Sequence, residues 1–227
     1  MDRTTMKVST QISGQKIIAP SNCTLIFFGL SEVLSINLSN LDTSNVTTME
    51  SMFYSCKRLT TINLTPLNTS NVTSMSDMFY GCRGLTSLDL TPLDTSNVTD
   101  MSSMFDGCRG LVSLDLTPLD TSNVINMGSM FRYCSGLASL DLTHLDTSNV
   151  TDMSHMFRYC SGLTNLDLTH LNTDNVTNMS YMFDGCTALT TLSPGEKFAF
   201  VGSDYQLPSG TWDSSDGTAY TSDGNSC

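Results

Sequence analysis

Positive charge is scarce in this sequence of 227 residues. Lys and Arg together number 10 against 22 Asp and Glu, so the formal net charge is −12 at pH 7. A strongly acidic balance repels nucleic acid and anionic membrane surfaces, and it favours solubility or basic partners. We therefore expect no nucleic-acid partner and no insertion into a membrane.

Long apolar segments are also missing. No run of 18 apolar residues is present, so the sequence predicts no membrane-spanning helix. The first residues, MDRTTMKVST, lack the apolar centre of a secretion signal. If the protein is exported, we expect the export and anchor segments to lie outside this chain.

The sequence has no recognisable catalytic or metal motif. Glycine-rich phosphate loops are absent, and the three histidines suggest no Ser-His-Asp or Cys-His arrangement. The six regularly spaced cysteines are never two to four residues apart, as they would be in a typical zinc site. We therefore expect a non-enzymatic monomer without a cofactor or a metal.

What the sequence does have is a 26-residue repeat. Phenylalanine and cysteine recur at this step without a slip, at Phe53, Phe79, Phe105, Phe131, Phe157 and Phe183, and at Cys56, Cys82, Cys108, Cys134, Cys160 and Cys186. Repeats of this length indicate a solenoid, because one unit cannot enclose its own apolar face and must stack on its neighbours. With 39% apolar residues in periodic positions, the chain is predicted to be one elongated folded domain.

One repeat reads LTSLDLTPLDTSNVTDMSSMFDGCRG, from Leu85 to Gly110. The L-x-x-L-x-L start alternates apolar and polar residues like a short strand, and the apolar residues from Val98 to Cys108 have helical spacing. Glycines at the end of the unit, Gly110, Gly136 and Gly162, suit a helix exit with positive φ. The predicted fold is an α/β solenoid of the leucine-rich-repeat type, with a parallel strand ladder on one face and short helices on the other.

Copies such as LDTSNVTDMSSMFDGC and LNTSNVTSMSDMFYGC resemble the 26-residue repeat of BspA-like bacterial surface proteins, over roughly residues 30 to 192. That resemblance implies an extracellular location on the bacterial cell surface. It also implies adhesion to a surface or matrix protein, or a glycan, of a host or a neighbouring cell.

The repeat pattern divides the chain into three predicted parts. Residues 1–32 form an N-terminal cap, residues 33–192 a solenoid of six coils, and residues 193–227 a C-terminal cap with a hairpin or linker. Within the last part we expect a closing strand from Phe198 to Tyr205. Cys23 and Cys227 lie at opposite ends of the array, so we expect no disulfide between them.

A row of carboxylates is expected in the middle of the strand face. Its members are Asp89, Asp115, Asp141 and Asp167, flanked by Thr91, Thr117 and Thr143. Carboxylates about 5 Å apart repel, so they must have raised pKa values, accept hydrogen bonds from nearby Ser and Thr, or attract cations. The row is a solvated face, a surface for a basic or polar partner, or a calcium site, although the D-x-D-x-D-G calcium loop is lacking.

A second candidate surface lies at the predicted helix edge, where Arg132, Tyr133, Arg158 and Tyr159 gather in two adjacent repeats. Arginine near a helix end can simply complement the helix dipole, whereas Arg beside Tyr is also favourable interface chemistry. His144 and His170 share one turn position in adjacent repeats and are interpreted as exposed turn residues rather than metal ligands.

Other repeated polar residues have structural interpretations. The Asp and Asn residues of the D-T-S-N segment are expected to satisfy backbone amides, and the cysteines to be small buried core residues. The predicted function is therefore adhesion or protein and ligand binding. The alternatives are a structural spacer, an ice- or glycan-binding flat face, and, least supported, a hydrolase, since identical carboxylates in every coil provide no unique acid and base.

Overall fold

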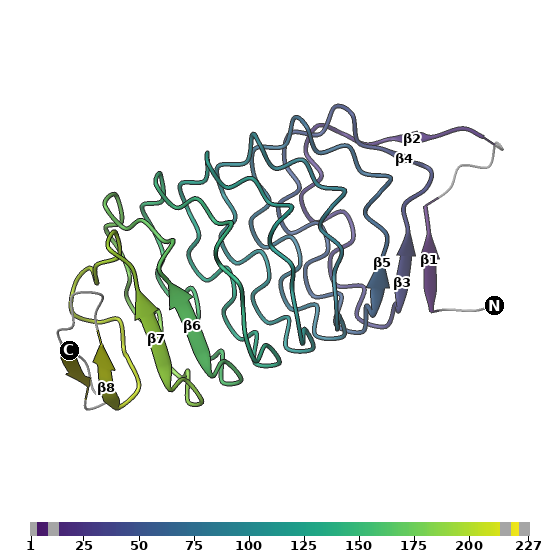
Figure 1. The fold of residues 1–227 in the computed structure, drawn as a ribbon. Coiled ribbons are helices and arrows are strands. Elements are labelled where there is room, and N and C mark those ends of the chain that lie inside the picture. Colours follow the sequence, from purple (N-terminus) through teal and green to yellow (C-terminus); the bar gives the residue numbers. More distant parts are fainter. Residues whose placement is uncertain (1–3, 9–13, 214–218, 223–227) are drawn as a thin grey trace.

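The computed structural model describes residues 4–8, 14–213 and 219–222. Figure 1 shows successive coils stacked side by side along one axis, with β1 at one end and β8 at the other. Each coil is one 26-residue repeat, and neighbouring coils are parallel. The predicted repeat solenoid with parallel strands is therefore confirmed.

Parallel strands line one face near both ends of the array. At the N-terminal end, a three-stranded sheet contains β1 (Thr5–Lys7), β3 (Ser35–Asn37) and β5 (Thr61–Ile62). At the C-terminal end, β6 (Asn165–Leu168) pairs with β7 (Thr191–Pro194). At the equivalent positions of the intervening coils, residues 87–90, 113–116 and 139–142, the chain keeps the alternating sequence pattern but has no assigned strand. The prediction of one strand in every coil is therefore correct only for the outer coils.

A second line of parallel contacts runs along another edge of the coils. β2 (Ile17–Ile18) pairs with β4 (Leu41–Asp42), and single bridges then join equivalent residues from coil to coil. The bridged residues are Asn22, Thr48, Ser74, Asp100, Asn126, Asp152 and Asn178. Because each bridge advances by one whole repeat, the coils stay in register throughout.

The segment predicted to be helical is a run of tight turns, and the described residues contain no helix. The amides of Met52 and Tyr54 donate to carbonyls three residues earlier, at 3.2 and 3.0 Å. The amides that alternate with these behave differently: those of Ser51 and Phe53 donate to the next coil, at 2.8 and 2.9 Å. An α-helix would send every amide to the carbonyl four residues back. The prediction of short helices was therefore wrong.

Left-handed backbone conformations explain why no helix forms. In the coil of Phe53, Ser51 and Ser55 have φ values of 54° and 59°, and the same two positions recur in later coils, as at Ser103 and Gly107. Positive φ is incompatible with a right-handed helix. Turns repeated in this way place Met49, Met52 and Phe53 on the core side with the same spacing of three and four that a helix would give.

The glycines at the end of each unit have a different role from the one predicted. Gly110, Gly136 and Gly162 are not among the residues with positive φ. A Cβ at each would lie 2.5 Å from a backbone carbonyl oxygen about one repeat earlier in the chain. Glycine is needed there because the two backbones approach closely, and not because of the helix exit that we expected.

The core consists of side-chain rows that run the length of the solenoid. All six repeated phenylalanines are fully buried, and neighbouring rings stack with centroids 5.4–6.0 Å apart. Rows of Leu, Val, Met and Cys surround them. Consecutive coils thus share one continuous apolar core, as the repeat predicts.

Buried threonines join the coils where backbone pairing is absent. The hydroxyl of Thr69 donates to the carbonyl oxygen of Asp94 in the next coil, at 2.9 Å, and accepts from the amide of the same residue, at 2.8 Å. Thr43, Thr95, Thr121 and Thr147 make the same pair of bonds. The hydroxyl of one threonine thereby satisfies both the amide and the carbonyl of one residue in the next coil.

The two ends are closed by imperfect continuations of the coil. At the N-terminal end, Phe27 stacks on Phe53 with centroids 5.4 Å apart. At the C-terminal end, the carbonyl of Tyr205 accepts the amide of Phe183 at 3.0 Å, in place of a further coil. The closing strand expected from Phe198 to Tyr205 is a loop. β8 (Gly210–Asp213) and β9 (Ala219–Ser222) follow as an antiparallel pair, and Cys227 lies outside the described residues.

Candidate ligand-binding surfaces

The predicted carboxylate row is exposed on the strand face, and each member closes a small turn. Oδ1 of Asp89 accepts the amide of Thr91 at 3.0 Å and its hydroxyl at 2.7 Å. Asp115, Asp141 and Asp167 each accept the amide two residues on, at 2.9 Å. This is an Asx turn, in which a side-chain oxygen replaces a backbone acceptor. We call Asp89, Asp115, Asp141 and Asp167 with Thr91, Thr117 and Thr143 the Asp–Thr face.

Earlier coils make the same turn without a charge. Oδ1 of Asn63 accepts the amide of Thr65 at 2.9 Å, and Oδ1 of Asn37 accepts the amide of Ser39 at 3.0 Å. An amide oxygen therefore serves the turn as well as a carboxylate oxygen does. It follows that the negative charge of the four aspartates is not required by the local fold.

Hydrogen bonding keeps these carboxylates ionised. Hydrogen bonds from Thr91 lower the pKa of Asp89, and repulsion from Asp115 opposes this only weakly. Hydrogen bonds from the threonine two residues on likewise lower the pKa of Asp115, Asp141 and Asp167. The sequence left three alternatives for carboxylates placed so close together: raised pKa values, hydrogen bonds from nearby Ser and Thr, or bound cations. The hydrogen bonds are present, and the pKa values are lowered and not raised.

The two turn histidines lie beside the carboxylate row. The charge on His144 helps to lower the pKa of Asp115 and of Asp141, and His170 acts in the same way on Asp141 and Asp167. Both imidazoles are exposed. Within residues 4–8, 14–213 and 219–222, no group of three or more His, Cys, Asp or Glu is placed to hold a metal ion. The face therefore presents alternating charged and hydroxyl groups to solvent.

The Arg and Tyr residues gather on the turn side of the coils, away from the strand face. The Tyr133 and Tyr159 rings stack with centroids 4.7 Å apart. Guanidinium groups of Arg109 and Arg132 lie 5.1 and 5.0 Å from the centre of the Tyr133 ring, and that of Arg158 lies 4.9 Å from the Tyr159 ring. These cation–π contacts order long side chains that would otherwise be flexible. We call these five residues the Arg–Tyr cluster.

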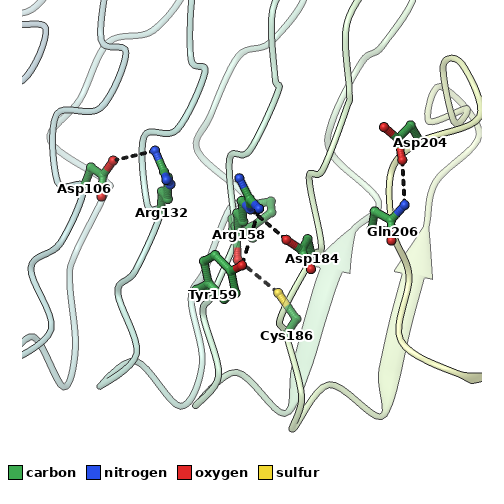
Figure 2. Close-up of polar contacts among 9 residues, drawn as sticks. Asp106, Arg132, Arg158, Tyr159, Asp184, Cys186, Asp204 and Gln206 are labelled. Atoms are coloured by element: carbon green, nitrogen blue, oxygen red, sulfur yellow. Dashed lines mark hydrogen bonds and ion pairs between the residues drawn. The ribbon is translucent and has the colours of Figure 1, made fainter. Parts of the chain in front are cut away.

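Carboxylates of adjacent coils pair with two of these arginines (Figure 2). Nε of Arg158 lies 2.7 Å from Oδ2 of Asp184, and a terminal nitrogen of Arg132 lies 3.8 Å from Oδ2 of Asp106. The arginines therefore interact with rings and carboxylates, and the idea that they complement a helix dipole fails because the segment is not helical.

Sequence reasoning missed the two aspartates of this site. Asp106 and Asp184 occupy the same position of the repeat as Arg132 and Arg158, so the order along the solenoid is Asp, Arg, Arg, Asp. The repeat predicts both, because Asp106 lies 26 residues before Arg132 and Asp184 lies 26 residues after Arg158. Asp106 is only 2% exposed, and burial raises its pKa to about 7, although Arg132 opposes the shift.

Two other polar sets have structural roles. Oδ1 of Asp94 and of Asp120 accepts the amide two residues on, at 3.1 and 3.0 Å, as predicted. The asparagines of the same segment differ from the prediction, because the exposed side-chain amides of Asn97 and Asn123 donate to a backbone carbonyl of the preceding coil, each at 2.8 Å. The cysteines from Cys23 to Cys186 are free and buried. Each repeat thiol also donates to a phenylalanine carbonyl of the preceding coil, which sequence reasoning did not anticipate.

A family model matches most of the chain, over residues 21–113 and 108–194, and its description is "Mycoplasma protein of unknown function, DUF285". The chain belongs to the DUF285 family. No curated protein matches this DUF285 chain. Among the described residues, no helix could cross a lipid bilayer.

Three solved structures similar to the DUF285 chain are bacterial leucine-rich-repeat proteins. The T. pallidum leucine-rich-repeat protein has a TM-score of 0.51 and 22% identity over 82% of this chain and 78% of its own. A Bacteroides ovatus leucine-rich-repeat protein has a TM-score of 0.46 and 20% identity over 85% and 58%. A leucine-rich cell surface protein of Faecalibacterium prausnitzii has 0.22 and 14% over 83% and 87%. At these identities, the T. pallidum likeness shows the solenoid fold alone.

Proposed function

We propose that this chain is a non-enzymatic, BspA-like repeat domain of the bacterial cell surface that binds a partner through its Asp–Thr face. The partner is a basic or polar protein, or a glycan, on a host or neighbouring cell. Export and anchor segments would lie outside this chain, and the domain would act as a monomer.

The observation that supports this proposal is that the local fold does not require the negative charge of the four aspartates. Asn63 closes its turn as Asp89 does, so the fold does not account for four consecutive aspartates. Their pKa values are lowered, so the row is fully charged at neutral pH. Because coils stack in register, the charges recur at a constant step that suits an extended partner.

The test replaces charge and leaves the turn intact. We would compare Asp89→Asn, Asp115→Asn and Asp141→Asn in one chain with a matched control, Asp94→Asn, Asp120→Asn and Asp146→Asn. The control residues accept the same kind of amide bond, from Ser96, Ser122 and Ser148. Binding of each chain would be measured on a lysine-rich peptide and on surfaces coated with extracellular-matrix protein.

We expect saturable binding by the native chain and by the control, and loss of at least about tenfold in affinity in the first variant. Equal affinity of the two variants would contradict the Asp–Thr face as the binding surface. Absence of saturable binding by the native chain would favour the alternative, a spacer, for which the uninterrupted phenylalanine row gives the necessary stiffness.

A further inference from the structure

The Arg–Tyr cluster is a positive surface on a protein of net charge −12. Its three arginines are not equally neutralised. Arg158 makes a close ion pair with Asp184 at 2.7 Å, whereas the Arg132 contact with Asp106 is 3.8 Å long, beyond hydrogen-bonding distance. Arg109 is exposed and does not take part in the ion pairs found among the described residues. Positive charge therefore remains available at Arg109 and Arg132.

Arg132 also has an unused donor. Its Nε is buried and has no hydrogen-bond partner, although the side chain as a whole is 30% exposed. A buried donor without a partner costs free energy, because it has lost water without gaining a replacement. A carboxylate from solvent could contact only the exposed part of this side chain, because the buried Nε is closed to a ligand.

The tyrosines limit what kind of ligand fits. The Tyr133 ring contacts Arg109 from the preceding coil and stacks on Tyr159 of the following coil. Sugar rings bind proteins by stacking on open aromatic faces, and here those faces are covered by guanidinium groups and by each other. The groups that remain for a ligand are the N–H donors of the arginines, which recognise planar anions such as carboxylates.

We propose that the Arg–Tyr cluster is a second binding surface, which takes an acidic segment of a partner protein, with Arg109 and Arg132 donating to its carboxylates. Stacking on Tyr133 holds both guanidinium groups in place before binding, which reduces the entropy lost on association. Tyr and Arg are also the residues that contribute most to protein–protein contacts. The surface is opposite in charge to the Asp–Thr face and does not depend on it.

The experiment measures binding of a fluorescent glutamate-rich peptide to the native chain by anisotropy, at low and at high salt. Binding is expected at low salt and should weaken as salt screens the charges. Arg109→Gln combined with Arg132→Gln should lower the affinity at least about tenfold. The matched control, Lys57→Gln with Arg58→Gln, removes two exposed positive charges near the other end of the array and should leave the affinity within about twofold.

Arg132 is partly buried, so circular dichroism and thermal unfolding would confirm that the double variant folds. Arg109→Gln alone provides a second test, because Arg109 is exposed and its replacement does not disturb the core. The proposal is overturned if the native chain does not bind the peptide, if both arginine variants bind as well as the control, or if heparin binds while the peptide does not. Retention of peptide binding by the Asp–Thr face variant is the expected result for an independent surface.

Discussion

The thiol of Cys82 donates to the backbone carbonyl of Phe53 in the preceding coil, with 3.2 Å between sulfur and oxygen. Because the repeat places a cysteine after every core phenylalanine, this contact recurs at each junction between coils. The cysteine row therefore fills space in the core and also adds a directional link between neighbours.

Loss of one such thiol should destabilise the solenoid. In Cys108→Ala, the carbonyl of Phe79 loses the thiol as a donor and the core loses a sulfur atom. We expect a decrease of about 1–2 kcal/mol in the free energy of unfolding, measured by urea denaturation. An unchanged midpoint and slope would show that the thiol contact contributes nothing to stability.

The same thiols should be chemically inert in the native protein. All seven cysteines from Cys23 to Cys186 are buried, which closes them to a reagent in solution. Burial raises the pKa of Cys186 to about 12, so its thiolate, the reactive form, is rare at neutral pH. A hydrogen bond with Cys82 lowers the pKa of Cys56, so that thiol is protected by its burial alone. In a Cys227→Ser chain, we expect a chromogenic thiol reagent to modify no cysteine rapidly under native conditions and to modify every cysteine in denaturant. Rapid native reaction would contradict the burial of the row.

The buried threonines should contribute more than their polarity suggests. In Thr95→Val, the amide and the carbonyl of Asp120 both lose their partner, the threonine hydroxyl. Because each orphaned group costs about 1–3 kcal/mol, we expect a loss of roughly 2–4 kcal/mol in the free energy of unfolding. Thr86→Val, at an exposed position, is the control and should have an effect near zero. Similar effects of the two changes would argue against the threonine link.

Asp106 should make stability depend on pH. Burial raises its folded pKa from 3.8 to about 7, so the neutral acid is favoured in the folded state. Its stabilising contribution is present below the unfolded pKa and is lost as pH rises through about 7. We expect Asp106→Asn to gain stability relative to the native chain between pH 4 and 8, by at most about 4 kcal/mol. Thermal unfolding across this range measures the gain, and a constant difference between the two proteins would contradict it.

Much of the architecture could be predicted from spacing alone. The unbroken repeat from Phe53 to Phe183 predicts the stacked core, because identical side chains must meet in a solenoid. It also brings Tyr133 onto Tyr159, and it would have placed Asp106 beside Arg132.

The turns could not be predicted in the same way. Apolar spacing of three and four residues is shared by helices and by successive turns, and the left-handed positions are occupied by residues such as Ser51, Tyr133 and His155, which give no signal for positive φ. The available indication was glycine at the position that Ser55 and Tyr133 hold in other coils, as at Gly81, Gly107 and Gly185.

The central claim is that the coils stack in register, and removal of a repeat tests it most directly. Deleting residues 111–136 removes one unit and joins Gly110 to Leu137, so every row continues and Asp106 meets Arg158. Deleting residues 111–123 instead removes half a unit, so that equivalent side chains of the coils before and after the deletion no longer lie in one row. We expect the first chain to unfold cooperatively at a somewhat lower temperature and the second to show no cooperative transition. Equivalent unfolding of the two chains would contradict the stacked solenoid.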